Sequence, residues 1–377
     1  MKLDGLRVID LSVFLPGPCL TLALADHGAE VIKVEQPGEG DPTRHIGQSD
    51  GPSTVYFRNL NRGKKSIVLD LKSAAGREAL LRLAETADVF LEAFRPGVMT
   101  RLGIDYAAVS ARNPRIVYCS ISAFGQDGPY KYRPAHDLAV EALSGGIGLT
   151  LGADDKPAIP GVAIADMVSS LQSLAGIMMA LYRRTITDKG DYLDMTMHDS
   201  MLAAMPNVMG PTIAENRQPI PKHERTMGGS AFYQIYETKD GRHMVLGGQE
   251  MKFVNTLLEK LGRPDLAALC EPGPGAHQKP LIEFLRGVFI GRPLADWIEW
   301  FKPLDVCFAP VNTLAEALAD PNAVSRGMVL TDEKGRRFLG PAIKFLNEPA
   351  RPSLKEPALG QHTDAILGGL RNNTERR

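Results

Sequence analysis

Four ionisable side chains stand at expected helix starts, where acid–base or nucleophilic chemistry can be positioned. His136 and Asp137 precede an apolar run, Asp166 opens a long apolar stretch, and Glu250 follows a Gly-Gly-Gln turn. A helix N-terminus carries unpaired N–H groups and partial positive charge, so it can stabilise an oxyanion or keep a carboxylate ionised. These residues could therefore act as a general base, a general acid or a nucleophile. Plainer roles fit equally: an aspartate often only caps a helix, and a histidine near a turn is commonly a polar loop residue.

A group of basic residues flanks two of the expected strands, at 66–71 and 88–91. They are Arg62, Lys64, Lys65, Lys72, Arg95 and Arg101. Open α/β sheets bind ligands beyond the carboxyl ends of their parallel strands. A basic rim at that edge suits a phosphorylated ligand, and ordinary solvated surface is the alternative interpretation.

The elements that must position these residues alternate between strand and helix patterns. Buried-strand patterns occur at 6–11, 30–34, 66–71, 88–91 and 116–120, with helices between them and further helices at 167–185 and 194–204. This alternation predicts an α/β fold with a mostly parallel sheet. The first strand is followed by Pro16-Gly17-Pro18 rather than G-x-G-x-x-G, so the nicotinamide dinucleotide fingerprint is absent.

The composition changes after residue 204. Prolines and glycines punctuate 205–229, which indicates a linker. A hairpin signal at Asp240-Gly241 and a helix at 251–261 then indicate a smaller α+β unit. We expect a large domain from 1–204 and 340–377, a linker at 205–229, a small domain at 230–325 and a return linker at 326–339.

Charge and cysteine usage narrow the function classes. The 377 residues are 44% hydrophobic and carry a formal charge of −1, so no basic excess favours nucleic acid or an acidic membrane. The four cysteines are far apart, which argues against a disulfide framework or zinc ribbon and predicts a reducing, cytoplasmic compartment. The eight scattered histidines give a metal site little support, and the most apolar stretch is shorter than a membrane span.

Several segments, in order along nearly the whole chain, resemble the class III CoA-transferase family, which also contains the alpha-methylacyl-CoA racemases. They are G-L-R-V-I-D-L-S…P-G-P, L-A-D-H-G-A-E-V-I-K-V-E, N-R-G-K-K-S-I-V-L-D-L-K, F-R-P-G-V-M-T-R-L-G-I, S-A-F-G-Q-D-G-P and L-G-Q-H-T-D. The resemblance implies a coenzyme A thioester as substrate, with no permanently bound cofactor. It also implies a Rossmann-like large domain completed by both chain ends, a small domain and an interlocked homodimer.

The resemblance assigns roles to the ionisable residues. In the family, the residue matching Asp166 is the central carboxylate: transferases use it as a nucleophile that forms an anhydride and then a thioester, and racemases use it as a base. His136 and Asp137 match racemase positions, and Glu250 falls where racemases have a supporting glutamate. The resemblance thus favours racemisation at C2 of 2-methyl-branched acyl-CoA by His136 and Asp166, with CoA transfer through Asp166 as the alternative. A catalytically silent CoA-binding protein is a third, less favoured reading.

The resemblance also places residues around coenzyme A. They are Leu69, Lys72, Arg62, Phe94, Arg95 and Arg101. Two departures from the family pattern concern this ligand: Gln36 stands where an arginine near the CoA phosphates often occurs, and Ala93 replaces an asparagine. Leu15 replaces the glutamine of formyl-CoA transferases, which argues against a small polar acceptor.

Overall fold

The computed structural model describes residues 1–374 and divides the chain into two compact units. The first unit contains Met1–Ser144, Pro160–Ala204 and the chain from Asp320 on, and the second contains Gly145–Ile159 and Met205–Ala319. The segment expected as a linker, 205–229, thus groups with the second unit, where Gly275 N donates to Gly229 O at 2.8 Å. Residues 326–339 group with the first unit, because Leu339 N donates to Asn59 Oδ1 at 3.0 Å.

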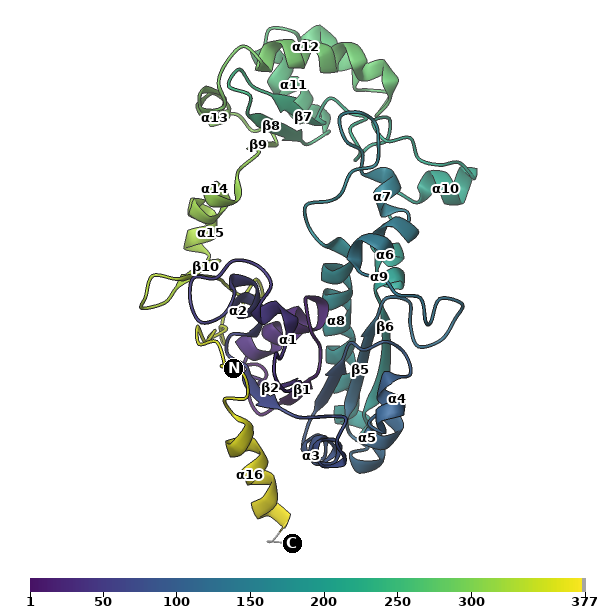
Figure 1. The fold of residues 1–377 in the computed structure, drawn as a ribbon. Helices are drawn as coiled ribbons and strands as arrows, with labels where there is room; N and C mark the ends of the chain where they lie inside the picture. Colours follow the sequence, from purple (N-terminus) through teal and green to yellow (C-terminus); the bar gives the residue numbers. More distant parts are fainter. Residues whose placement is uncertain (375–377) are drawn as a thin grey trace. The chain divides into compact units, whose positions relative to one another are not determined.

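The first unit is built on a six-stranded parallel sheet (Figure 1). Its strands, in spatial order, are β3 (Lys65–Val68), β2 (Glu30–Glu35), β1 (Arg7–Asp10), β4 (Val89–Glu92), β5 (Val117–Ser122) and β6 (Asp191–Thr196). Ile9 of β1 pairs with Ile32 on one side and Phe90 on the other. The strand order therefore reverses beside β1, and the crevice expected of such sheets lies at the carboxyl ends of β1 and β4. The predicted parallel α/β fold is confirmed.

Helices cover both faces of this sheet, because alternate strand residues point to opposite sides. Ile9, Phe90 and their neighbours pack on one face with α3 (Ala74–Ala84) and α5 (Tyr106–Arg112). Val8, Val89 and their neighbours pack on the other with α1 (Pro16–Asp26) and α8 (Ile164–Thr187). The remaining helices of the unit are α2 (Val55–Asn61), α4 (Val98–Leu102), α6 (Asp137–Leu143), α9 (Met197–Ala203), α15 (Pro321–Ser325) and α16 (Thr363–Thr374).

Both ends of the described chain contribute to this unit. Strand β1 lies inside the sheet, and the start of α16 bonds to its edge strand: Val68 N donates to Thr363 Oγ1 at 3.0 Å. A short antiparallel pair, β10 (Val329–Thr331) and β11 (Arg337–Leu339), completes the unit. One local expectation is wrong: 194–204 is not helical throughout, since β6 runs to Thr196, whose side chain then caps α9 by accepting from Asp199 N at 2.8 Å.

The second unit is α+β, as predicted. An antiparallel sheet of β7 (Tyr233–Glu237), β8 (His243–Gly247) and β9 (Phe308–Pro310) carries the expected hairpin at Gly241. Its core is rich in aromatic side chains and includes Trp297, whose Nε1 donates to Phe289 O at 2.8 Å. The helices are α7 (Gly146–Leu149), α10 (Gly210–Glu215), α11 (Met251–Lys260), α12 (Lys279–Phe289), α13 (Leu294–Phe301) and α14 (Leu314–Ala319).

Helix α8 has one buried face and one exposed apolar face. Ile177 and Leu181 lie in the sheet core, whereas large apolar side chains on the other side are exposed, namely Leu171, Met178, Met179, Tyr182 and Ile186. Within residues 1–374, α8 is the one helix long and apolar enough to cross a membrane by length and composition, a test that core helices also pass. We call these five residues the α8 stripe.

Candidate active site

Two carboxylates from α6 cap the start of α8. Ile164 N donates to Glu141 Oε1 at 2.9 Å, and Asp166 N donates to Asp137 Oδ1 at 3.0 Å. Residues four apart lie on one helix face, so Asp137 and Glu141 reach the same helix end together. Helix α8 has no cap of its own, because Ala163 at its N-cap has no side chain able to accept. Asp166 therefore lies in the first turn of α8 and does not serve as its N-cap.

Asp166 sits where an ionised carboxylate is disfavoured. Burial, and then the nearby carboxylates of Asp137 and Glu141, raise the pKa of Asp166 from 3.8 to about 7. The charge of Asp166 also acts on Tyr56, which lies on α2. Burial and this charge raise the pKa of Tyr56 to about 12. Asp166 can consequently gain or lose a proton near neutral pH, as a catalytic acid–base group must.

His136 stands at the N-cap of α6, one residue before Asp137. Its side chain is exposed and makes no capping hydrogen bond. The imidazole meets the ring of Phe14 edge-on, with the ring centroids 6.1 Å apart and the planes at 85°. Since the next residue, Asp137, bonds to Asp166, the structure brings His136, Asp137 and Asp166 to one end of α6 and α8.

Buried charges fix the turn after β1 that carries Phe14. Asp10 accepts hydrogen bonds from Ser12 N at 2.9 Å and from Thr21 Oγ1 at 2.6 Å, and Lys33 Nζ donates to Ser12 O at 2.9 Å. Burial opposes ionisation of Asp10, but Lys64 and Lys33 outweigh it and hold its pKa at about 2. Lys64, expected on the basic rim, is itself buried 3.1 Å from Asp10, and burial lowers its pKa to about 8.

The residues expected around coenzyme A divide into two groups. Lys72, Arg95 and Arg101 are exposed beyond β3 and β4, and within residues 1–374 none of them forms an ion pair. Leu69 is buried directly after β3, and Phe94 is half-buried two residues after β4. By position, the three basic side chains remain available for an anionic ligand at the carboxyl edge of the sheet.

Arg62 is placed differently from the expectation. Its side chain is 1% exposed and forms an ion pair with Asp26, and its Nη2 also donates to Leu339 O at 2.9 Å. Such a pair holds the guanidinium inside the unit, joining α1, α2 and β11. The structure thus gives Arg62 a packing role and does not present it to a phosphate.

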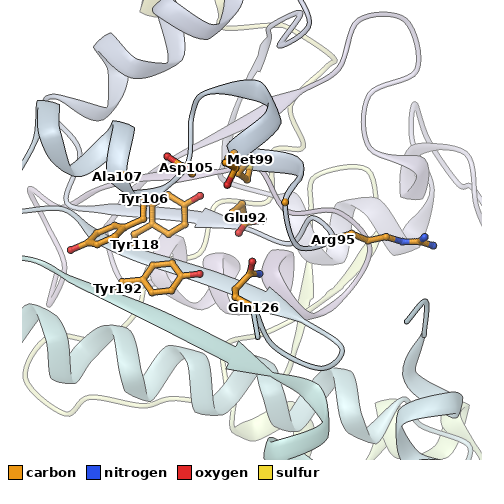
Figure 2. Close-up of a pocket in the computed structure, with 11 residues that line it drawn as sticks. Glu92, Arg95, Met99, Asp105, Tyr106, Ala107, Tyr118, Gln126 and Tyr192 are labelled. Atoms are coloured by element: carbon orange, nitrogen blue, oxygen red, sulfur yellow. The ribbon is translucent and has the colours of Figure 1, made fainter. Parts of the chain in front are cut away.

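A small cavity lies behind the expected CoA-binding segment (Figure 2). It has a volume of about 190 Å³ and is lined on one side by the rings of Tyr106, Tyr118 and Tyr192. Figure 2 shows the side chain of Arg95 directed away from these rings. Glu92, 3% exposed, accepts from Phe94 N at 2.7 Å, and burial raises the pKa of this glutamate to about 7. A buried carboxyl group therefore holds the backbone of Phe94.

Glu250 belongs to the second unit, where it is the exposed N-cap residue of α11 without a capping hydrogen bond. The group that the first unit assembles by itself is therefore His136, Asp137 and Asp166. Reasoning from sequence missed Phe14, Tyr56 and Glu141 at this site, and only Glu141 left a signal, its spacing of four from Asp137. Within residues 1–374, no three His, Cys, Asp or Glu side chains gather to hold a metal ion.

Comparisons with known proteins identify the family. The family model described as CoA-transferase family III matches residues 3–363. The succinyl-CoA:glutarate CoA-transferase of Homo sapiens is 33% identical, covering 97% of this chain and 85% of its own. The alpha-methylacyl-CoA racemase of Homo sapiens is 34% identical, covering 97% of this chain and 93% of its own.

A solved structure agrees with these relatives. A CAIB/BAIF family protein from Brucella suis superposes with a TM-score of 0.86 at 32% identity, covering 98% of this chain and 99% of that one. Sequence and fold therefore point to one family across almost the entire chain. The protein belongs to CoA-transferase family III, an enzyme family that acts on CoA thioesters.

Proposed function

We propose that this enzyme racemises 2-methyl-branched acyl-CoA thioesters at C2, with His136 and Asp166 as its two bases. The observation that carries the proposal is the Asp166 carboxyl group at the start of α8, whose pKa is raised to about 7. The backbone N–H of Asp166 donates to Asp137, the residue that follows the exposed imidazole of His136 at the start of α6. In a racemase each base must accept a proton in one direction and donate it in the other. A carboxyl group with a pKa near neutrality, together with an imidazole, meets that requirement.

The proposed reaction breaks one C–H bond and forms another. One base removes the proton at C2, and the electron pair passes into the thioester carbonyl to give a planar enolate. The conjugate acid of the other base then returns a proton to the opposite face of C2, which inverts the centre. Asp137 positions Asp166 by holding its backbone N–H, and Lys72, Arg95 and Arg101 would bind the CoA phosphates. The roles of Leu69, Phe94 and Glu250 stay predictions from the resemblance.

CoA transfer to a carboxylate acceptor is the second candidate. It is favoured by the succinyl-CoA:glutarate CoA-transferases among the relatives, at 32% and 33% identity. Asp166 would attack the donor thioester and expel CoA as a thiolate, forming a mixed anhydride. The thiolate would then attack the aspartyl carbonyl and release the donor's carboxylate, leaving an aspartyl-CoA thioester. The acceptor carboxylate would attack this thioester in turn, and the thiolate would take the acceptor's acyl group and free Asp166. At neutral pH, a pKa of about 7 leaves roughly half of the Asp166 carboxyl groups ionised, and this form can act as a nucleophile or as a base. Racemisation stands first because it uses the exposed imidazole of His136 as a second base, a role that transfer does not require.

Two assays on one preparation separate these candidates. Incubation with a 2-methylacyl-CoA in heavy water should place deuterium at C2, and Asp166→Asn should abolish inversion while leaving the protein folded. Hydroxylamine added with an acyl-CoA should leave Asp166 unmodified. A hydroxamate on Asp166 with net CoA exchange, and no deuterium at C2, would establish transfer instead. Asp194→Asn, a carboxyl change on β6, serves as the matched control.

We also propose that the chain works as the interlocked homodimer that the resemblance implies, with the α8 stripe covered by the second copy. Support comes from the five large apolar side chains exposed along one helix face, a patch that monomeric proteins rarely leave uncovered. Light scattering should give twice the chain mass, and Met179→Lys should reduce it. A monomer at working concentration would contradict the proposal.

A further inference from the structure

Phe14 has a backbone conformation that its side chain makes unfavourable. Its φ is +62°, in the left-handed region where residues with a bulky side chain are genuine outliers. Such strain survives only where the surroundings impose it, and it concentrates at functional sites. The ring is not held in the core, since Phe14 remains 36% exposed. Packing of the phenyl ring into the interior therefore does not explain the conformation.

The surroundings of the turn impose this conformation. Asp10 and Lys33 hold Ser12 on both sides through buried hydrogen bonds, and α1 begins at Pro16. The turn is also closed tightly, because Gly17 lies so near Ser12 that a Cβ at position 17 would collide with the Ser12 side chain. The result is a rigid turn at the carboxyl end of β1 that presents one aromatic ring outward.

That ring lies beside one of the two proposed bases. A base must approach the reacting carbon to about 3–3.5 Å. Because the ring centroids are only 6.1 Å apart, a carbon that His136 reaches on the side of Phe14 would hold its substituent against the Phe14 ring. An aromatic edge offers dispersion contacts to a methyl group but no compensation for a desolvated carboxylate.

Resting on the proposed function, we infer that Phe14 determines substrate specificity by forming an apolar wall against C2, which selects an alkyl substituent and rejects a charged one. Isobutyryl-CoA and methylmalonyl-CoA test this directly. The two thioesters are similar in size, and both carry a hydrogen at C2. Isobutyryl-CoA has two methyl groups at C2, whereas methylmalonyl-CoA has one methyl group and one carboxylate there. Wild-type enzyme should bind isobutyryl-CoA more tightly than methylmalonyl-CoA and should exchange its C2 hydrogen for deuterium faster.

The informative variant is Phe14→Gly, because glycine adopts a positive φ without strain. Its thermal midpoint should equal or exceed that of wild type. Its preference for isobutyryl-CoA over methylmalonyl-CoA, in calorimetric affinity and in deuterium exchange, should fall by about tenfold, the usual effect of one lost apolar contact. Phe14→Asn, which also tolerates this conformation but adds polarity, should narrow the preference further. Phe14→Leu keeps an apolar side chain and should retain most of the preference for isobutyryl-CoA.

The outcomes separate this inference from the proposed function. If wild type exchanges isobutyryl-CoA but the preference is unchanged in folded Phe14→Gly, the specificity role is wrong and racemisation stands. If binding preference falls in Phe14→Gly but wild type exchanges neither thioester, the specificity role stands and racemisation is wrong. A folded wild type that binds both thioesters equally would also overturn the inference.

Discussion

Replacing Glu141 by glutamine should shift the pH dependence of catalysis to lower pH. Glu141 is 1% exposed, and its Oε1 accepts from Ile164 N at the start of α8. Glutamine has nearly the same shape and keeps an oxygen that can cap Ile164, so α8 should begin at the same residue. What disappears is a negative charge beside Asp166. Removing a like charge makes ionisation easier, so the pKa of Asp166 should fall.

The size of the shift follows from the order of its causes. Burial, Asp137 and Glu141, in that order, raise the pKa of Asp166 from 3.8 to about 7. As the weakest of three, Glu141 accounts for at most about one pKa unit, or about 1.4 kcal/mol. At about pH 6 the ionised fraction of Asp166 would rise from roughly one in eleven to roughly one in two, about fivefold. This is an upper limit, because burial also raises the pKa of Glu141 and so disfavours the charge that acts on Asp166.

The assay is deuterium exchange at C2 of isobutyryl-CoA across the acidic limb of the pH profile, where Asp166 must be ionised to act as a base. Glu141→Gln should move the limb to lower pH, and Asp194→Asn should leave it in place, since Asp194 is not among the groups that act on Asp166. A limb that stays fixed, or moves to higher pH, in folded Glu141→Gln would refute the reasoning.

Three further changes test other parts of the structure. Burial raises the pKa of Glu92 from 4.5 to about 7, so the stability it contributes is present below pH 4.5 and lost as the pH rises through 7. Glu92→Gln should therefore raise the free energy of unfolding, measured in urea, by up to about 3 kcal/mol at about pH 8 and have little effect near about pH 4. A larger gain near about pH 4 than at about pH 8 would contradict this. Arg62→Ala leaves Asp26 unpaired and should lower the free energy of unfolding by about 3–5 kcal/mol, and a loss below about 1 kcal/mol would count against the buried pair. Lys72→Ala should weaken calorimetric binding of CoA thioesters by about tenfold, from roughly 1.5 kcal/mol for a charge-assisted hydrogen bond, and an unchanged affinity at low salt would exclude Lys72 from the CoA site.

The sheet was largely readable from sequence because buried parallel strands are nearly continuous apolar runs. Strands β1 to β5 coincide with such runs. Strand β6 was missed because it lies at the sheet edge, where D-Y-L-D-M-T forms neither a continuous apolar run nor a strict alternation of polar and apolar residues. The start of α8 was also misplaced, because its capping groups come from α6 and no local capping residue marks Ile164.

From the sequence, the residues of the site could be predicted one by one, but their arrangement could not. Asp166, His136 and Asp137 each stand at a helix start, a local feature, but their meeting depends on the contact between α6 and α8. Arg62 looked like a surface cation because no sequence pattern shows that Asp26 lies opposite it in the fold. The conformation of Phe14 was invisible, since the pattern around it contains no glycine at that position and the strain is imposed by buried charges.

The central claim is that His136 and Asp166 act on opposite faces of C2. Separate enantiomers of a 2-methylacyl-CoA, incubated in heavy water with His136→Asn and with Asp166→Asn, test it most directly. Wild type should deuterate and invert both enantiomers. Each variant should retain exchange with only one enantiomer, a different one in each case, and neither should invert its substrate. Inversion at an undiminished rate by either folded variant would contradict the claim.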